Sequence, residues 1–192
     1  TELLKGIFGA EPFEQGAGIV GGETVRTPTP PAMKRLGVAF TPENRKEEGL
    51  VQILSTRVNM CLASMERLAG KGFINRARET AAASHYVDKL QIKVPDLDTE
   101  VSSLSGGNQQ KVVVGNWLGT RPRVILFDEP TRGIDVQAKQ QIFQVMWDLS
   151  REGIASVFVS TELEELVEVC HRILVMRRGE MVDEVRPDTI TP

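Results

Sequence analysis

Residues 124–131 read Val-Ile-Leu-Phe-Asp-Glu-Pro-Thr, an apolar run followed by two acidic residues. A short apolar run of this kind is typical of a strand that is buried on both faces of a parallel sheet. Around it, three predicted strands alternate with two predicted helices: strands at 123–127, 155–159 and 172–176, helices at 136–151 and 162–169. Alternating strands and helices predict an α/β fold with a parallel sheet covered on both faces.

The rest of the chain adds elements of both kinds. In chain order we expect a helix at 1–9, a hairpin at 15–26, a strand at 36–41, a charged loop at 43–49 and a helix from 105 to about 118. Residues 58–90 show apolar residues at helical spacing, and Gly70 and Gly72 separate two predicted helices there. This stretch predicts a helical insert in the α/β fold.

The composition is that of one ordinary globular domain. The 192 residues are 41 % hydrophobic and 26 % charged, and 23 basic against 26 acidic residues give a net charge of −3. This mildly acidic balance argues against nucleic-acid binding. Two cysteines are too few for a disulfide framework, and no apolar run approaches the roughly 18 residues that a membrane span needs. The first residues contain neither an initiator methionine nor a signal peptide.

Asp128 and Glu129 are the first candidates for chemistry. In open α/β sheets ligands bind at the carboxyl ends of the strands, where these two carboxylates are expected. A carboxylate there can hold Mg²⁺ beside nucleotide phosphates, and Glu129 can orient or deprotonate an attacking water. A solvent-exposed acidic turn, ended by Pro130, is the alternative that these residues leave open.

Residues 104–110, Leu-Ser-Gly-Gly-Asn-Gln-Gln, form the second candidate. Ser105 is suited to cap a helix, and Gly106 and Gly107 leave the N–H groups of its first turn unobstructed. Such a helix start attracts phosphate through its free donors and its dipole. A glycine-containing loop that merely starts a helix is the alternative.

Taken together and in this order, the two stretches resemble the nucleotide-binding domain of ATP-binding cassette (ABC) transporters, a P-loop NTPase-like fold. Residues 104–110 resemble the signature motif of that family, 125–129 its Walker B motif with the following glutamate, and 133–135 its D-loop. On this resemblance, residues of about 58–118 are the helical subdomain, and residues 1–57 and 119–192 belong to the α/β core.

A closer similarity is to the second cassette of the double-cassette ATPases of bacterial carbohydrate importers, of the ribose, galactose and xylose type. It rests on residues 43–50, 108–111 and 131–135. The resemblance implies ATP and Mg²⁺ as ligands, Glu129 as the catalytic residue, and Asp128 and Thr1 as ligands of Mg²⁺. The nucleotide-binding positions that it implies are Thr1, Glu43, Ser105, Gly106, Gly107, Gln109, Asp135 and Thr161.

The family pattern is incomplete in three places. No glycine-rich Walker A loop occurs in these residues, and Thr1-Glu2-Leu3 resembles the end of that loop, so we expect the chain to be cut within it and to lack the first sheet strands. Glu43 stands where the family has the glutamine of its Q-loop, and adds charge near phosphate. Thr161 stands in place of the switch histidine, and a hydroxyl cannot supply a cation.

These features predict an ATPase subunit that powers sugar import at the cytoplasmic face of the bacterial inner membrane. The partners implied are the first cassette of the same polypeptide, the membrane permease subunits and, indirectly, a periplasmic sugar-binding protein; no nucleic acid is expected. The main contribution expected is the signature motif of a composite ATP site, and the chain alone is expected to be inactive. The alternatives are a catalytically inert or regulatory cassette and a soluble ABC ATPase of another process.

Overall fold

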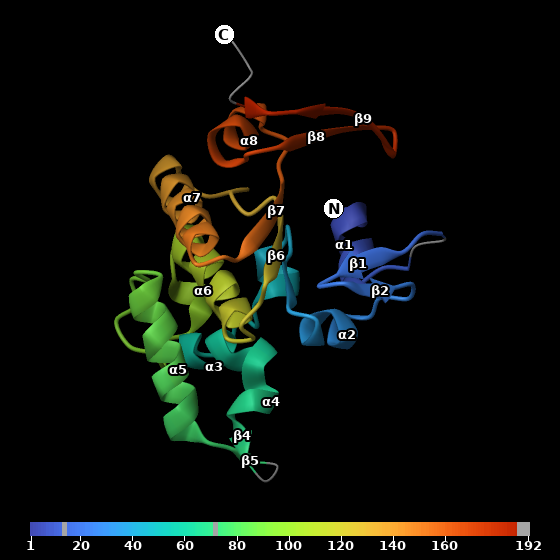
Figure 1. Ribbon diagram of the computed structural model, residues 1–192. Helices are drawn as coiled ribbons and strands as arrows, with labels where there is room; N and C mark the ends of the chain where they lie inside the picture. The colour runs from blue at the N-terminus through green and yellow to red at the C-terminus, as the bar shows by residue number, and fades with distance from the viewer. Residues whose placement is uncertain (13–14, 71–72, 188–192) are drawn as a thin grey trace.

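A three-stranded parallel sheet lies at the centre of the computed structural model, which describes residues 1–12, 15–70 and 73–187 (Figure 1). The strands lie in the order β3–β6–β7, and their bounds are Val38–Thr41, Val124–Asp128 and Ala155–Val159. The register pairs Phe40 with Leu126 and Phe127 with Phe158. Because β6 is the central strand, Asp128 at its end and Glu129 directly after it lie at the middle of the carboxyl edge.

The two faces of this sheet are covered by different helices, as Figure 1 shows. Ile125 and Phe127 pack with α6 (Gly106–Leu118) and α7 (Val136–Arg151) in the larger apolar core. Leu126 points to the other face and packs in a smaller core with α1 (Glu2–Phe8) and α2 (Pro30–Arg35). Successive side chains of a strand point to opposite faces, so the apolar run of β6 fills both cores. The predicted α/β fold is thereby confirmed.

Two features at the start of the chain agree with the predictions. Helix α1 ends at Gly9, whose φ of 79° is the left-handed conformation that glycine adopts without strain. Strands β1 (Gly18–Val20) and β2 (Glu23–Val25) form the expected antiparallel hairpin around the turn Gly21–Gly22. The charged loop after β3, in contrast, contains a short π-helical turn, η1 (Arg45–Gly49).

The helical insert is more broken than its spacing predicts. Instead of one helix before Gly70, the chain forms α3 (Thr56–Cys61), the 3₁₀ turn η2 (Leu62–Ser64) and α4 (Met65–Leu68). The two-residue strand β4 (Ala69–Gly70) follows and pairs antiparallel with β5 (Phe73–Ile74). The Ala63 N–H donates to the Asn116 side chain at 2.7 Å, a tertiary bond that competes with the regular helical ladder. Helix α5 (Arg76–Lys89) follows, whereas Gly72 lies outside the described residues.

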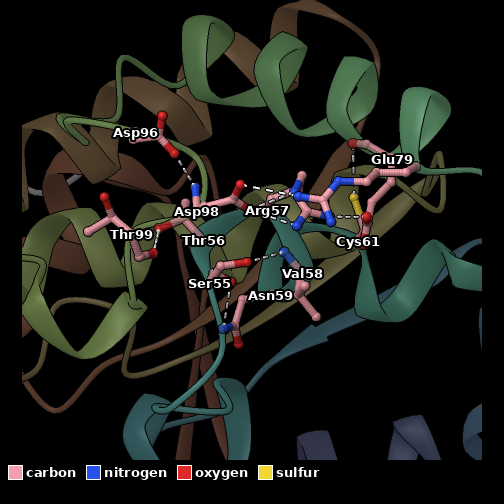
Figure 2. Close-up of polar contacts among 11 residues, drawn as sticks. Ser55, Thr56, Arg57, Val58, Asn59, Cys61, Glu79, Asp96, Asp98 and Thr99 are labelled. Carbon is pink, nitrogen blue, oxygen red and sulfur yellow. Dashed lines mark hydrogen bonds and ion pairs between the residues drawn. The ribbon is translucent and has the colours of Figure 1, made fainter.

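Arg57 joins the parts of this insert (Figure 2). Its guanidinium forms ion pairs with Glu79 of α5 and, at 2.6 Å, with Asp98 of the segment after α5. The hydrogen bonds from Arg57 hold the pKa of Asp98 below its ordinary value. The sequence favoured a surface position for Lys46, Arg57 and Met60; Lys46 is exposed, but for Arg57 and Met60 that prediction is wrong, because both are buried. The segment that Arg57 fixes leads through η3 (Val101–Ser103) into Ser105.

The last strands depart from the predicted sheet. After α8 (Leu163–Val169), β8 (Ile173–Arg177) pairs antiparallel with β9 (Glu180–Val185) and does not join β7. The Arg178–Gly179 turn, with φ of 53° and 81°, closes the local hairpin of β8 and β9. The first three residues of β7 are exposed, so the sheet is not covered throughout. The sequence predicts a fraying tail at residues 187–192, of which 188–192 lie outside the described residues.

Within residues 1–12, 15–70 and 73–187, the structure contains no helix with the length and apolar character that crossing a membrane requires.

Candidate functional site

Asp128 ends β6 at the bottom of a small polar cluster. Its side chain is fully buried, and Oδ1 lies 3.0 Å from the hydroxyl of Thr1, which precedes α1. The same hydroxyl lies 3.2 Å from Glu43 Oε2. Thr1, Glu43 and Asp128 are far apart in sequence, and three different elements bring them together.

This cluster suits a small divalent cation. Asp128 Oδ2 is buried without a hydrogen-bond partner, and an unpaired buried acceptor costs about 1–3 kcal/mol. The Asp128 carboxylate and the Thr1 hydroxyl are the hard oxygen ligands that Mg²⁺ takes, usually together with waters and phosphate. Across the described part of the chain no three His, Cys, Asp or Glu side chains gather into a metal site. One carboxylate and one hydroxyl leave coordination positions of a bound Mg²⁺ open for waters and phosphate oxygens.

Glu129 is held in an unusual backbone conformation next to this cluster. Its φ of 44° lies in the left-handed region, which costs a residue other than glycine about 1–3 kcal/mol. Its N–H donates to the Val159 carbonyl at 3.0 Å, and its Oε1 accepts from the Thr161 N–H at 2.9 Å. The carboxylate is thus fixed between the loops that follow β6 and β7.

A pocket of about 460 Å³ opens beside Glu129. It is lined by Glu129, Thr131, Arg132, Gly133, Ile134, Lys139, Thr161 and Glu162. Hydrogen-bond donors and carboxylates make up most of the pocket lining. The pocket therefore suits a polar ligand and a water molecule beside Glu129.

Ser105, Gly106 and Gly107 start helix α6. The Ser105 hydroxyl accepts from the Asn108 N–H at 3.5 Å and from its side-chain amide at 3.0 Å. A Cβ on Gly107 would lie 2.5 Å from the Cβ of Ala138 in α7, so only glycine lets the two helices approach this closely. A Cβ on Gly106 would meet the Arg45 guanidinium at 2.8 Å.

Arg45 links the start of α6 to the loop after β6. Its Nη1 donates to the Arg132 carbonyl at 2.9 Å and its Nη2 to the Gly133 carbonyl at 3.3 Å. Burial lowers the pKa of its guanidinium. Arg132 forms an ion pair with Glu43, so the charge of Glu43 is compensated within the chain. These contacts connect the Thr1–Glu43–Asp128 cluster with the glycines of α6.

Two predicted nucleotide-binding residues contact their own chain instead of the pocket. The Gln109 side chain is buried and donates to the Val101 carbonyl at 3.1 Å, while its Oε1 has no partner. Asp135 is the N-cap of α7, and its carboxylate accepts from the Ala138 N–H at 3.0 Å. The predictions for both residues stay predictions.

Sequence reasoning missed Arg45, Arg132, Lys139 and Glu165. Arg45 and Arg132 lie in segments 43–50 and 131–135, whose similarity to one transporter group was noted, but their partners are not apparent from sequence spacing. Glu165 is one of three glutamates at residues 162–165, and only tertiary packing distinguishes the buried one. We found no sequence signal that would have singled it out.

Comparisons with known proteins agree with this geometry. A family model described as "ABC transporter" matches residues 1–132. The ribose import ATP-binding protein RbsA of Oceanobacillus iheyensis is 41 % identical over 185 residues, which are 96 % of this chain and 37 % of that protein. RbsA 3 of Rubrobacter xylanophilus is 45 % identical over 179 residues, 93 % of this chain and 36 % of that one. The chain thus spans little more than a third of the length of these relatives.

The fold is similar to that of solved cassettes. A nucleotide-free ATP-binding cassette from an ABC transporter superposes with a TM-score of 0.80 at 18 % identity. The superposition covers 96 % of this chain and 75 % of that one.

Proposed function

The chain belongs to the ABC transporter family, and from this we propose that it is an ATP-binding subunit whose ATP hydrolysis powers sugar import in bacteria. The names of its relatives support ribose or a related sugar as the cargo. The observation that carries the proposal is the pair at the end of β6. Asp128 keeps a buried oxygen without a partner, and the Glu129 carboxylate is held in place beside an open pocket.

We assign Asp128 and the Thr1 hydroxyl to Mg²⁺, which when bound would offset the charge of the nucleotide phosphates. Glu129 would orient the attacking water and accept its proton. The backbone N–H of Thr161 would hold the Glu129 carboxylate in place, and this role does not require a histidine side chain. Glu43 would add an oxygen near the cation, because Arg132 compensates its charge.

The N–H groups at the start of α6, together with Ser105, Gly106 and Gly107, would bind phosphate of a nucleotide held mainly by another cassette. Gln109 and Asp135 would support this surface from within, through the contacts that fix α6 and α7. We therefore propose that the main contribution of this chain to a composite ATP site is its signature motif, residues 104–110.

The partners proposed are a second cassette, the permease subunits of an importer and, indirectly, a periplasmic sugar-binding protein, with the chain placed at the cytoplasmic face of the inner membrane. Residues of about 58–118 would be the helical subdomain that faces the permease. The Arg57 network supports grouping these residues together, because it joins α3 to α5 and to the segment that leads into Ser105.

Ribose uptake in cells that depend on an importer built with this chain tests the proposal. Gly107→Asp should abolish uptake, because a carboxylate at the start of α6 repels phosphate and clashes with Ala138. Two cassettes form two ATP sites, and we propose that the site served by Glu129 is the weaker one, because Thr161 stands in place of its switch histidine. Glu129→Gln should therefore reduce uptake less than Gly107→Asp does. Glu164→Gln is the matched control: it removes one exposed carboxylate and should leave uptake unchanged.

Equal effects of Gly107→Asp and Glu129→Gln would refute the asymmetry between the two ATP sites. Unchanged uptake in both variants, with protein levels equal to those of the control, would refute the ATPase role and favour an inert or regulatory cassette.

A further inference from the structure

We infer that Glu165 is a positioning residue that holds the Glu129 carboxylate in place, by tying together the loops that follow β6 and β7. The inference rests on the proposed function only in that it concerns Glu129. Glu165 lies on α8, does not contact the pocket, and has no part in the chemistry proposed above.

Glu165 is a buried carboxylate whose two oxygens are both engaged. Only 5 % of the residue is exposed. Its Oε2 accepts from the Thr131 hydroxyl at 2.7 Å and from the Ser160 hydroxyl at 2.9 Å, and its Oε1 accepts from Lys139 Nζ at 2.7 Å. One carboxylate thus joins the loop after β6, the loop after β7 and helix α7.

The bond to Thr131 acts on the backbone of Glu129. Thr131 is itself buried, and it follows Glu129 by two residues in a tight turn in which the Arg132 N–H donates to the Glu129 carbonyl at 3.1 Å. Glu129 has a left-handed φ, which persists only where the surroundings determine it. Anchoring the Thr131 side chain supplies such a restraint on one side of Glu129.

The bond to Ser160 acts on the side chain of Glu129. Ser160 directly precedes Thr161, whose N–H donates to Glu129 Oε1. The Ser160 hydroxyl also accepts from the Glu162 N–H at 3.0 Å, so its position sets the turn in which the Thr161 N–H points at Glu129. Glu165 therefore fixes both the residue that carries the carboxylate and the donor that holds it.

Lys139 completes the arrangement by supplying the opposite charge. Its Nζ lies 2.7 Å from both Glu165 and Glu162. Burial alone would raise the pKa of Glu165, but the hydrogen bonds from Lys139, Thr131 and Ser160 outweigh it and hold the pKa below its ordinary value. The ionised form, which accepts from both hydroxyls at once, is the one that this site selects.

The amide proton resonance of Thr161, measured by NMR on the 192-residue chain with ¹⁵N-labelled threonine, tests the inference. Glu129→Gln should move this resonance upfield, because a carboxylate acceptor deshields an N–H more strongly than a carboxamide does. In chains that also carry Glu165→Gln, the response to Glu129→Gln should be lost. The matched control is Glu164→Gln, an exposed glutamate on the same helix, which should leave the response intact.

A Thr161 response that survives Glu165→Gln would overturn the inference. So would a loss of the response accompanied by equal shifts at threonines remote from the site, such as Thr56 and Thr99, because Glu165 would then act on the whole fold. Lys139→Gln is a second variant with the same expected loss, should Glu165→Gln not fold.

ATP hydrolysis by the importer separates this inference from the proposed function. Glu165→Gln should lower kcat and leave KM for ATP unchanged, as expected for a residue that does not touch the nucleotide. If neither Gly107→Asp nor Glu129→Gln changes hydrolysis while the Thr161 response depends on Glu165, the proposed function fails and the positioning role stands.

Discussion

Replacing Gly107 by alanine should separate two helices that touch at this point. The added Cβ would lie 2.5 Å from the Cβ of Ala138, whereas non-bonded carbon atoms prefer about 3.5–4.0 Å. Helices α6 and α7 would have to move apart by roughly 1 Å or more, and overpacking of this kind costs about 1–3 kcal/mol. Removing a glycine from a helix recovers about 0.5–1 kcal/mol. We expect Gly107→Ala to lower the free energy of unfolding by about 1–2 kcal/mol.

A double-mutant cycle with Ala138→Gly isolates the clash. Without the Ala138 Cβ, the nearest atom to the new methyl group is the Ala138 Cα at 3.6 Å, an ordinary contact. Ala138→Gly alone should cost about 1 kcal/mol, the usual penalty for glycine in a helix. The double variant should then be no less stable than Ala138→Gly, which corresponds to a coupling energy of about 1–3 kcal/mol between the two sites.

Urea denaturation of the 192-residue chain, followed by circular dichroism, measures these free energies. Gly18→Ala is the control: a Cβ at this position would meet nothing within 4 Å, so the stability should change by less than about 0.5 kcal/mol. Additive costs for Gly107→Ala and Ala138→Gly would refute the close approach of α6 and α7 at Gly107.

Three further predictions concern the core and two titratable groups. Phe127→Ala should destabilise the chain by about 3–5 kcal/mol in the same denaturation assay, because the ring is fully buried; a loss below about 1 kcal/mol would contradict that packing. Burial raises the pKa of Cys61 to about 11, so at pH 8 only about one thiol in a thousand is ionised, and labelling by a thiol reagent should be slow until urea unfolds the chain. Equal labelling rates in the folded and unfolded chain would refute this. The lowered pKa of Glu165 means that its contribution to stability is present above its ordinary pKa of 4.5 and is lost as the pH falls below that value; in Glu165→Gln this part of the pH dependence should disappear.

The alternation of apolar runs with helical spacing was enough to predict most elements near the site. Helix α7 and strand β7 have the predicted bounds, and β6 differs by a single residue at each end. The reason is local: four apolar residues followed by acidic ones are typical of a buried strand of a parallel sheet with its polar end at the sheet edge. The break of the helix before Gly70 could not be predicted, because it depends on Asn116, which lies far along the chain.

The separate position of β8 was also beyond sequence reasoning. Its composition suits a parallel strand of the central sheet as well as it suits a hairpin. The turn at Arg178–Gly179, with its two left-handed residues, allows β9 to pair with β8, and the structure keeps this pair apart from the central sheet.

The sequence alone was enough to propose Asp128, Glu129 and the glycines at the start of α6 as candidate site residues. Each of these candidates was recognised by the residues directly beside it in the sequence. The family resemblance already implied that Thr1 and Asp128 lie together, whereas only the tertiary structure decided that Arg132 pairs with Glu43, that Arg45 bridges to Gly133, and that Glu165 ties two loops together. The physical reason is burial. Periodicity shows which face of an element is apolar, but a charged side chain is buried only where partners from distant segments satisfy it, and those partners become neighbours only when the chain is folded.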